Sequence, residues 1–398
     1  MKSIKEIYKT GKGPSSSHTM GPEKACKIFK NEQSEATSFK AVLYGSLAKT
    51  GKGHRTDGVI EETLYPVKCE VVFDTETKEI PHENTMDLFA YKNGEQIGYM
   101  RVLSVGGGDI VIEGREGKTS PDVYPHSTFS DIAEYCKAKN IRLSDYVEEF
   151  EGGDIYDFLK DVWRVMLNEI EEGLTKTGVL PGGLNVERKA QFLFNQRHID
   201  ESESTRENRI VCAYAFAASE QNADLGTVVT APTCGACAVL PAVLKYMSEK
   251  KQFSEERILK ALATAGLIGC LIKKNASISG AECGCQAEIG SACAMASAAL
   301  CELFEMGIDQ IEYASEVALE HYLGLTCDPV CGLVQIPCIE RNAVAAMRAI
   351  NCLSLANFLS GTRKISFDLV VRTMYETGKD MSGLYRETAE GGLAKLYK

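Results

Sequence analysis

Three cysteines stand where neighbouring residues keep the backbone irregular. Cys285 directly follows a glycine, Cys338 directly follows a proline, and Cys327 precedes a proline by two positions. Glycine and proline interrupt regular helix and let a bulky ligand approach the chain closely. Thiolates are the usual ligands of iron–sulfur clusters, and a helix N-terminus stabilises them. The pattern therefore indicates metal-cluster or thiol chemistry at these three positions.

The chain contains 15 cysteines, of which eleven lie between Cys234 and Cys352. A reducing compartment disfavours a disulfide framework, which favours metal binding or thiol chemistry. Simple packing stays open as well, because free cysteines are often buried in a core without a chemical role. Cys234 with Cys237 also forms a CxxC pair that suits redox chemistry or half of a zinc site. A structural zinc site needs a second close pair, for which Cys327 and Cys331 are the candidates.

A polar segment near the N-terminus could bind an anion. It lies between two Gly-Pro pairs and holds five consecutive polar side chains, those of Ser15, Ser16, Ser17, His18 and Thr19. Pro22 is well placed as the first residue of a helix. Hydroxyls and backbone N–H groups at a helix N-terminus suit a carboxylate or a phosphate. Helix capping explains one such hydroxyl but not all five residues, so we expect a binding segment for an anionic group.

A third group, in the segment 51–58, could move a proton. His54 carries the side chain that most often serves as a general base near neutral pH, and Asp57 follows as a group that could orient it. A surface histidine without a chemical role is the alternative. The segment adds a base to the thiols and the anion-binding hydroxyls.

The elements around these groups predict an α+β N-terminal domain, residues 1–148, followed by a mostly all-α helical domain, residues 149–398. Runs rich in β-forming residues predict strands at 67–73, 96–103 and 109–113. Residues 41–60 and the segment after Pro22 are expected to be helical in part. An acidic, glycine-containing run at 148–154 marks the boundary between the two domains.

Beyond the boundary the sequence predicts almost continuous helix. The expected helices are 156–174, 207–222, 236–250, 255–274, 286–306, 310–322, 337–359 and 366–387. Only 14 of the 102 residues from 261 to 362 are charged. Helices that are apolar nearly all round belong inside a bundle.

Composition excludes several classes of function. Of the 398 residues, 44% are hydrophobic and 25% are charged, and the net charge is −11. An acidic chain does not suit nucleic acid, no apolar run is long enough to span a membrane, and the first 25 residues lack the apolar stretch of a signal peptide. We therefore expect a cytoplasmic protein, with a homodimer as the default by base rate.

Taken together, the segments resemble the iron–sulfur-dependent L-serine dehydratases (L-serine ammonia-lyases). The matching segments are GPSSSHTMGP at 13–22, GKGHRTD at 51–57, SVGGG at 104–108, LPGGLNV at 180–186, TAPTCG at 230–235, GCQ at 284–286 and CDPVCGLVQIPCIERN at 327–342. They occur in the family's order and cover both halves of the chain. The resemblance implies a β-type domain fused to an α-type domain in one chain.

The resemblance also implies a cofactor and a reaction. Cys285, Cys327 and Cys338 would hold a [4Fe–4S] cluster, leaving one iron open as a Lewis acid for the hydroxyl of L-serine. Loss of water would lead to pyruvate and ammonia without pyridoxal phosphate. His54 is expected to remove the α-proton, with His18 as the second candidate. The substrate carboxylate would share the open iron or dock on the segment 15–19.

The sequence departs from the family at four places. Cys331 stands where the family usually has glycine, and Cys283 where it often has valine, so either is a spare thiol or a competing ligand. The chain has no C-terminal cysteine of the kind that reaches the fourth iron in some members. His126 only loosely matches a family loop with an active-site histidine, and stays a weak candidate for substrate binding.

Two other functions stay open beside serine dehydration. One is that of another non-redox [4Fe–4S] lyase, such as an L-cysteine desulfidase. The other is that of a non-enzymatic iron–sulfur or zinc protein, for instance an oxygen sensor. The segments 15–19 and 51–57 argue against a sensor, because a sensor needs neither a carboxylate site nor a base.

Overall fold

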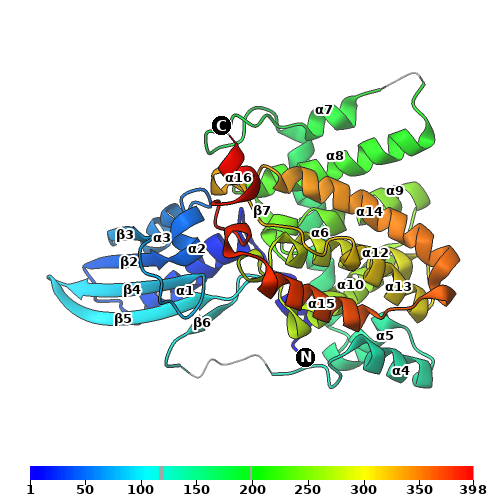
Figure 1. Ribbon diagram of the computed structural model, residues 1–398, viewed down its shortest axis with the longest axis horizontal. Coiled ribbons are helices and arrows are strands. Elements are labelled where there is room, and N and C mark those ends of the chain that lie inside the picture. The colour runs from blue at the N-terminus through cyan, green and yellow to red at the C-terminus, as the bar shows by residue number, and fades with distance from the viewer. Residues whose placement is uncertain (116–120, 198–199, 398) are drawn as a thin grey trace.

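The computed structural model describes residues 1–115, 121–197 and 200–397. A small part built on a β-sheet lies beside a larger helical part, and the last segment of the chain runs across both (Figure 1). The prediction of an α+β region followed by a mostly helical region is confirmed.

The small part is a five-stranded sheet with helices on one face. The strand order is β3-β2-β4-β5-β6, formed by β2 (Ser38–Tyr44), β3 (Cys69–Asp74), β4 (Thr85–Lys92), β5 (Glu95–Ser104) and β6 (Ile110–Ile112). Only β2 and β3 pair in parallel, and such a pair needs a crossover connection. That connection consists of α2 (Gly45–Thr50) and α3 (Thr56–Leu64), while α1 (Gly21–Glu32) packs against α3. The turn between α2 and α3 carries His54.

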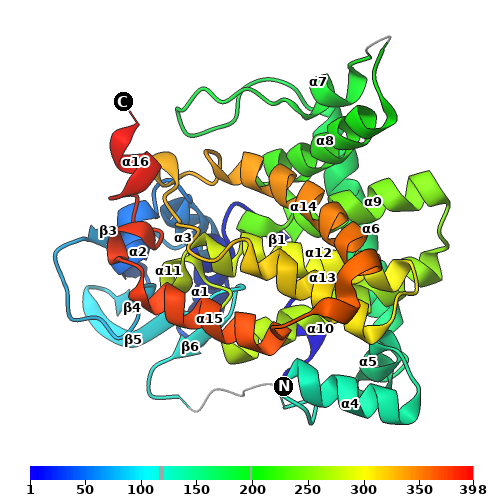
Figure 2. The ribbon, with the colours of Figure 1, turned by 45° about the vertical axis from the view of Figure 1, so that its right-hand side comes forward.

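The helical part is organised around one fully buried helix. All residues of α12 (Ile289–Leu303) are buried, and α12 packs against α9, α10, α13 and α14. The helices of this part are α4 (Phe129–Lys139), α5 (Leu143–Glu151), α6 (Ile155–Thr175), α7 (Ala190–Asn195), α8 (Glu203–Ala223), α9 (Val239–Lys251), α10 (Glu255–Asn275), α11 (Gly280–Cys283), α12, α13 (Ile308–Glu320), α14 (Cys338–Leu359) and α15 (Phe367–Asp380), with α16 (Gly392–Leu396) at the end. Figure 2 shows α12 surrounded by its neighbours.

Small residues let these helices approach closely. A Cβ added at Gly173 of α6 would lie 2.3 Å from the carbonyl oxygen of Ala217 in α8. Any larger side chain would force α6 and α8 apart, because such a contact is far shorter than van der Waals distance. The alanine- and glycine-rich composition is therefore a packing requirement of the bundle.

The two ends of the chain tie the parts together. Near the N-terminus, β1 (Thr10–Lys12) pairs antiparallel with β7 (Thr227–Val229), and Ile4, Ile7 and Tyr8 are buried in the core of the helical part. Helices α4 and α5 also contribute buried side chains to that core. The division at residue 148 stays a prediction, and elements from both sides of it share one hydrophobic core.

The element boundaries differ from the sequence prediction at some places. Residues 41–60 were expected to be helical in part, and they are: residues 41–44 belong to β2, whose burial alternates along the strand, and helix begins at Gly45. The strand β4 was not predicted. The last long helix ends at Asp380 rather than residue 387, because the backbone of Tyr385 and Glu387 hydrogen-bonds to Cys327 instead of continuing the helix.

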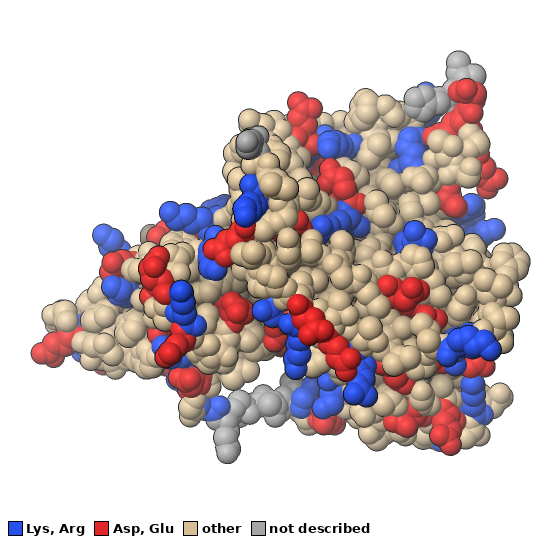
Figure 3. Space-filling view, viewed as in Figure 1, with Lys and Arg blue, Asp and Glu red and all other residues tan. Residues whose placement is uncertain are grey.

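Within the described residues, one helix, Cys338–Thr362, is long and apolar enough to span a bilayer by length and composition alone. Its mean hydropathy reaches 1.3, and 39% of this apolar stretch is buried. In the structure, α14 packs against α8, α9, α12 and α13. On the face shown in Figure 3, acidic and basic side chains are interspersed.

Candidate active site

His54 lies buried in the turn between α2 and α3, with one ring nitrogen held by the backbone. Its Nδ1 lies 3.0 Å from the carbonyl oxygen of Thr50. A carbonyl only accepts, so Nδ1 carries the hydrogen and Nε2 carries the lone pair. His54 Nε2 is buried without a hydrogen-bond partner among the described residues, and burial lowers the pKa of His54 to about 4. The ring is therefore neutral at physiological pH, with a basic nitrogen facing a pocket.

His18 stacks behind His54, with the ring centroids 4.3 Å apart. Its Nε2 lies 3.1 Å from Ser46 Oγ and 3.0 Å from Thr50 Oγ1. Both hydroxyls already donate their hydrogens to backbone carbonyls, so His18 Nε2 must donate and the lone pair is on Nδ1. Burial and the neighbouring His54 hold the pKa of His18 well below its usual value. His18 is therefore a neutral residue whose ring packs against that of His54.

Hydroxyl groups lock the two histidine segments to each other. Thr19 Oγ1 donates to the carbonyl oxygen of His54 at 3.1 Å, and Thr56 Oγ1 donates to the carbonyl oxygen of His18 at 2.7 Å. Ser15 Oγ accepts from the backbone N–H of His18 at 3.1 Å. Of the five polar residues in the segment 15–19, only Ser15 lines the pocket. The other four, including Ser16 and Ser17, are buried around it.

The three cysteines line the same pocket as Ser15 and His54. Cys285 follows Gly284, which has φ of +72° and lies so close to the carbonyl oxygen of Leu325 that a Cβ would be 2.8 Å away. Only glycine suits that position. Cys327 is fixed through its backbone to the last segment of the chain, and Cys338 is the first residue of α14. Irregular backbone thus aims all three thiols into one place.

The pocket favours a thiolate at Cys285. A hydrogen bond from the Cys327 thiol and, against burial, the positive charge of Arg341 lower the pKa of Cys285 to about 6. The same pairing and burial raise the pKa of Cys327, and burial raises that of Cys338. The Arg341 guanidinium is held by the carbonyl oxygen of Thr326 at 2.7 Å and by Asp328 Oδ1 at 3.2 Å. A fixed cation next to three thiols stabilises a negatively charged ligand set.

Two carboxylates, the partly buried Glu288 and the buried Glu387, complete the pocket. Glu288 Oε1 accepts from Thr233 Oγ1 at 2.8 Å, and its Oε2 lies 4.0 Å from the sulfur of Cys327. Glu387 Oε1 lies 3.6 Å from His18 Nδ1 and 3.8 Å from His54 Nε2. Burial and the charge of Cys285 raise the pKa of Glu387 to about 8. A polar pocket with acids on both sides can hold a cationic group as well as thiolates.

Sequence reasoning missed Arg341, Glu288 and Glu387 as site residues. Glu288 lies three positions after Cys285, and Arg341 three positions after Cys338. One helical turn after a predicted ligand was the signal that could have found both. Glu387 offered no such signal, because its position depends on a segment that was expected to continue a helix.

The structure places two other predicted residues away from this chemistry. His126 Nδ1 lies 2.9 Å from the hydroxyl of Tyr146, and the ring packs among Tyr135, Tyr146 and Phe150 outside the pocket lining. The Asp57 carboxylate accepts from the backbone N–H of Gly58 at 2.9 Å. The carbonyl of Thr50, rather than Asp57, hydrogen-bonds to His54 Nδ1.

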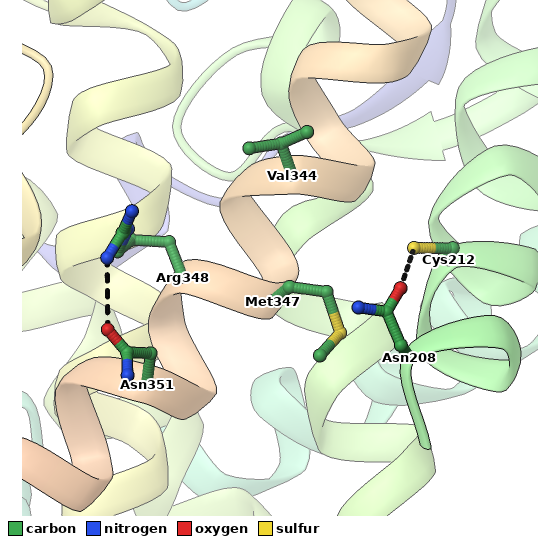
Figure 4. A pocket seen from close by; sticks show the side chains of 6 residues that line it. All are labelled: Asn208, Cys212, Val344, Met347, Arg348 and Asn351. Carbon is green, nitrogen blue, oxygen red and sulfur yellow. Dashed lines mark hydrogen bonds between the residues drawn. The ribbon is translucent and has the colours of Figure 1, made fainter. Parts of the chain in front are cut away.

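The remaining cysteines lie outside the pocket lining. Cys283 packs against Gly378, Cys331 is exposed, and Cys234 Sγ contacts Met20 Sδ at 3.3 Å. A separate hollow lies on the surface between α8 and α14, where Cys212 faces Asn208 beside Met347 (Figure 4). It brings together no second nucleophile, histidine or carboxylate among the residues that line it.

The donor set fits an iron–sulfur cluster. Three thiols from three irregular segments, two of them buried and that of Cys338 partly buried, converge beside an arginine, and one of them has a pKa shifted toward the thiolate. The described residues that line the pocket include no fourth cysteine. Three thiolates leave one iron of a four-iron cluster without a protein ligand.

Comparisons with known proteins identify the family of this chain. A family model described as the serine dehydratase alpha chain matches residues 28–394. The L-serine dehydratase of Haemophilus influenzae is 40% identical over 449 aligned positions, which cover 99% of both chains. L-serine dehydratase TdcG of Escherichia coli is 41% identical, with 98% of each chain covered. The alignments are longer than this chain, so these relatives carry inserted segments that it lacks.

Proposed function

Because the chain belongs to the serine dehydratase family, we propose that it is an L-serine ammonia-lyase that forms pyruvate and ammonia without pyridoxal phosphate. The observation that carries the proposal is the convergence of three thiols and an unpartnered histidine nitrogen in one buried pocket. Thiols alone would suit a sensor, whereas a neutral base beside them suits elimination.

Cys285, Cys327 and Cys338 are the residues that would hold a [4Fe–4S] cluster. When bound, the cluster supplies an iron with an open position, a Lewis acid that makes the β-hydroxyl of serine a better leaving group. Arg341 offsets the negative charge of the thiolates, and Gly235 and Gly280 leave room beside Glu288.

His54 removes the α-proton through Nε2. The Cα–H electron pair forms the Cα–Cβ double bond while the bond between Cβ and the hydroxyl oxygen breaks. The leaving hydroxide takes up a proton, in balance the one that His54 removed, which gives aminoacrylate and water. Thr50 keeps the second proton on Nδ1, and Glu387 Oε1 at 3.8 Å faces the positive charge that the ring acquires. Aminoacrylate then tautomerises to an imine, and water hydrolyses the imine to pyruvate and ammonia.

The substrate carboxylate lies against the segment 15–19 in this proposal. Ser15 lines the pocket next to His54, and the segment starts a helix, where backbone N–H groups favour an anion. His18 acts as a positioning residue, because its Nε2–H is committed to Ser46 and Thr50.

Anaerobic purification followed by iron, sulfide and pyruvate analysis tests the proposal. We expect about four iron and four sulfide per chain, visible absorbance typical of a cluster, and pyruvate formation from L-serine without added pyridoxal phosphate. Iron-free protein that forms pyruvate at the same rate, or cluster-loaded protein that forms none, would contradict it.

A further inference from the structure

The pocket contains a carboxylate that no hydrogen-bond donor satisfies. Glu387 is buried, yet among the described residues no group donates a hydrogen bond to its carboxylate. Its nearest polar neighbours are His18 Nδ1 at 3.6 Å and His54 Nε2 at 3.8 Å. Neither nitrogen donates to Glu387, because His54 Nε2 carries a lone pair and the lone pair of His18 Nδ1 faces Ser15 Oγ at 3.4 Å. An acceptor left open in this way is completed by a donor from outside the chain.

The ligand that fits is a cation with N–H groups. Glu387 Oε1 is the charged acceptor of a group that, with the two histidine rings, lies within 4.8 Å, and a cation with N–H groups at about 2.9 Å from this oxygen would complete it while the Nε2 lone pair of His54 stays free for the α-proton.

Substrate geometry selects Glu387 for this role. The ammonium nitrogen and the α-proton of an amino acid are bonded to the same carbon, so their acceptors must be close neighbours. Glu387 Oε1 lies 3.8 Å from the nitrogen that takes the α-proton. Glu288 instead accepts from Thr233 and faces the sulfur of Cys327.

We propose that the Glu387 carboxylate binds the α-ammonium group of the substrate and so selects β-hydroxy amino acids over 3-hydroxy acids that lack the amine. The inference rests on the proposed function, because it places the amine relative to His54. The backbone holds Glu387 in place. Its carbonyl oxygen accepts from Ser46 Oγ at 2.7 Å, and its N–H donates to the carbonyl oxygen of Cys327 at 2.9 Å.

The test compares two ligands that differ only in the amine. The KM and kcat for L-serine and the inhibition constant of 3-hydroxypropionate are measured for the cluster-loaded wild type, Glu387→Gln and Glu390→Gln. Glu390 is the matched control, since it lies on the same segment but pairs with Lys49 at the surface. Iron content and the visible spectrum of each variant report whether the cluster site is intact.

We expect Glu387→Gln to raise the KM for L-serine about ten- to hundredfold, the usual value of a charged hydrogen bond, while 3-hydroxypropionate inhibits as before. Glu390→Gln should change neither constant. Equal weakening of both ligands, no change in either, or a loss in kcat alone would overturn the proposal. So would one equivalent of a non-cluster metal that Glu387→Gln removes. Absence of pyruvate in the wild type would instead refute the proposed function.

Discussion

At the scale of single residues, one backbone carbonyl decides the chemistry of the site. The carbonyl oxygen of Thr50 accepts the ring N–H of His54 at Nδ1. The lone pair of Nε2 therefore faces the pocket, and no described residue hydrogen-bonds to it. A side-chain carboxylate in the same place would add a charge to an already acidic pocket. The carbonyl orients the ring without adding a negative charge to the pocket.

Replacing His54 by alanine should therefore affect the chemical step. We expect kcat to fall about 10²–10⁴-fold, the usual value of a positioned general base, with the cluster spectrum unchanged. Exchange of the serine α-proton with deuterated solvent, where the wild type shows it, should disappear.

His18→Ala is the comparison variant. It should act mainly through KM and keep the exchange, because the His18 ring holds the binding segment through Nδ1, which lies 3.4 Å from Ser15 Oγ. Exchange lost in His18→Ala and kept in His54→Ala would reverse the two roles, and loss of the cluster in either variant would make that histidine structural.

Burial of His54 also predicts a dependence of stability on pH. Its pKa is about 4 in the folded protein, against 6.5 for an unperturbed histidine. The unfolded chain therefore takes up this proton first, and the contribution of His54, complete above pH 6.5, is lost as the pH falls toward 4. Between pH 6.5 and pH 5 the loss is about 2 kcal/mol. The thermal unfolding midpoint should fall more between these pH values in the wild type than in His54→Gln, and equal falls would contradict the prediction.

The cysteines divide into ligands and bystanders. Cys285→Ala, Cys327→Ala and Cys338→Ala should each abolish both iron binding and activity, because each removes a thiol from the pocket. Cys331→Ala is the matched control, since it lies in the same loop as Cys327 but is exposed. Iron and sulfide analysis of each variant measures its cluster content. The ligand assignment would be overturned if the Cys331 variant lost the cluster and the Cys338 variant retained it.

At the scale of elements, close helix contacts depend on glycine. Gly173→Ala would bring a Cβ within 2.3 Å of the carbonyl oxygen of Ala217, so α6 and α8 must move apart. We expect this to lower the free energy of unfolding by about 1–3 kcal/mol. The thermal midpoint should fall by several degrees. Gly153→Ala is the control, because no atom lies within 4 Å of its added Cβ. Its free energy of unfolding should change by no more than about 0.5 kcal/mol. Equal midpoints for the two variants would show that the helices move apart freely.

Elements whose burial follows a simple period were predictable, and others were not. The buried helix α12 was predictable, because its sequence contains a long run of small, uncharged residues. Residues 41–44 carry alternating burial that is invisible without knowing which face the sheet covers. Position 387 depends on pairing between Cys327 and a segment almost sixty residues later, and no local pattern encodes such a contact. The three thiols and two histidines could be predicted as site residues, because neighbouring glycine, proline, serine and threonine residues indicate irregular loops in the local sequence.

At the scale of the whole molecule, the pocket is lined by residues from the sheet part, the helical part and the last segment of the chain, and the ribbons of these three lie next to one another in Figure 2. The sheet part contributes His18 and His54, the helical part the three cysteines, and the last segment Glu387. None of these parts alone assembles the pocket.

A pocket lined by three thiols predicts sensitivity to oxygen. A cluster with one iron open to substrate is also open to oxidants, so aeration should abolish pyruvate formation, and ferrous iron with a thiol should restore it. The test is to measure activity and iron content in parallel during aeration. Unchanged turnover by aerated, iron-free protein would refute a role for the cluster.

The position of Glu387 has a consequence for biosynthesis. A nascent chain exposes both histidines first and the three thiols much later, and domains fold in that order during translation. The carbonyl oxygen and N–H of Glu387, which join Ser46 to Cys327, emerge after every other group of the pocket. A ribosome-bound intermediate therefore has thiols without the segment that closes over them. We expect maturation factors to deliver iron and sulfide after translation, to a fully synthesised chain, so that a translation arrest before residue 387 leaves a protein that does not retain its metal.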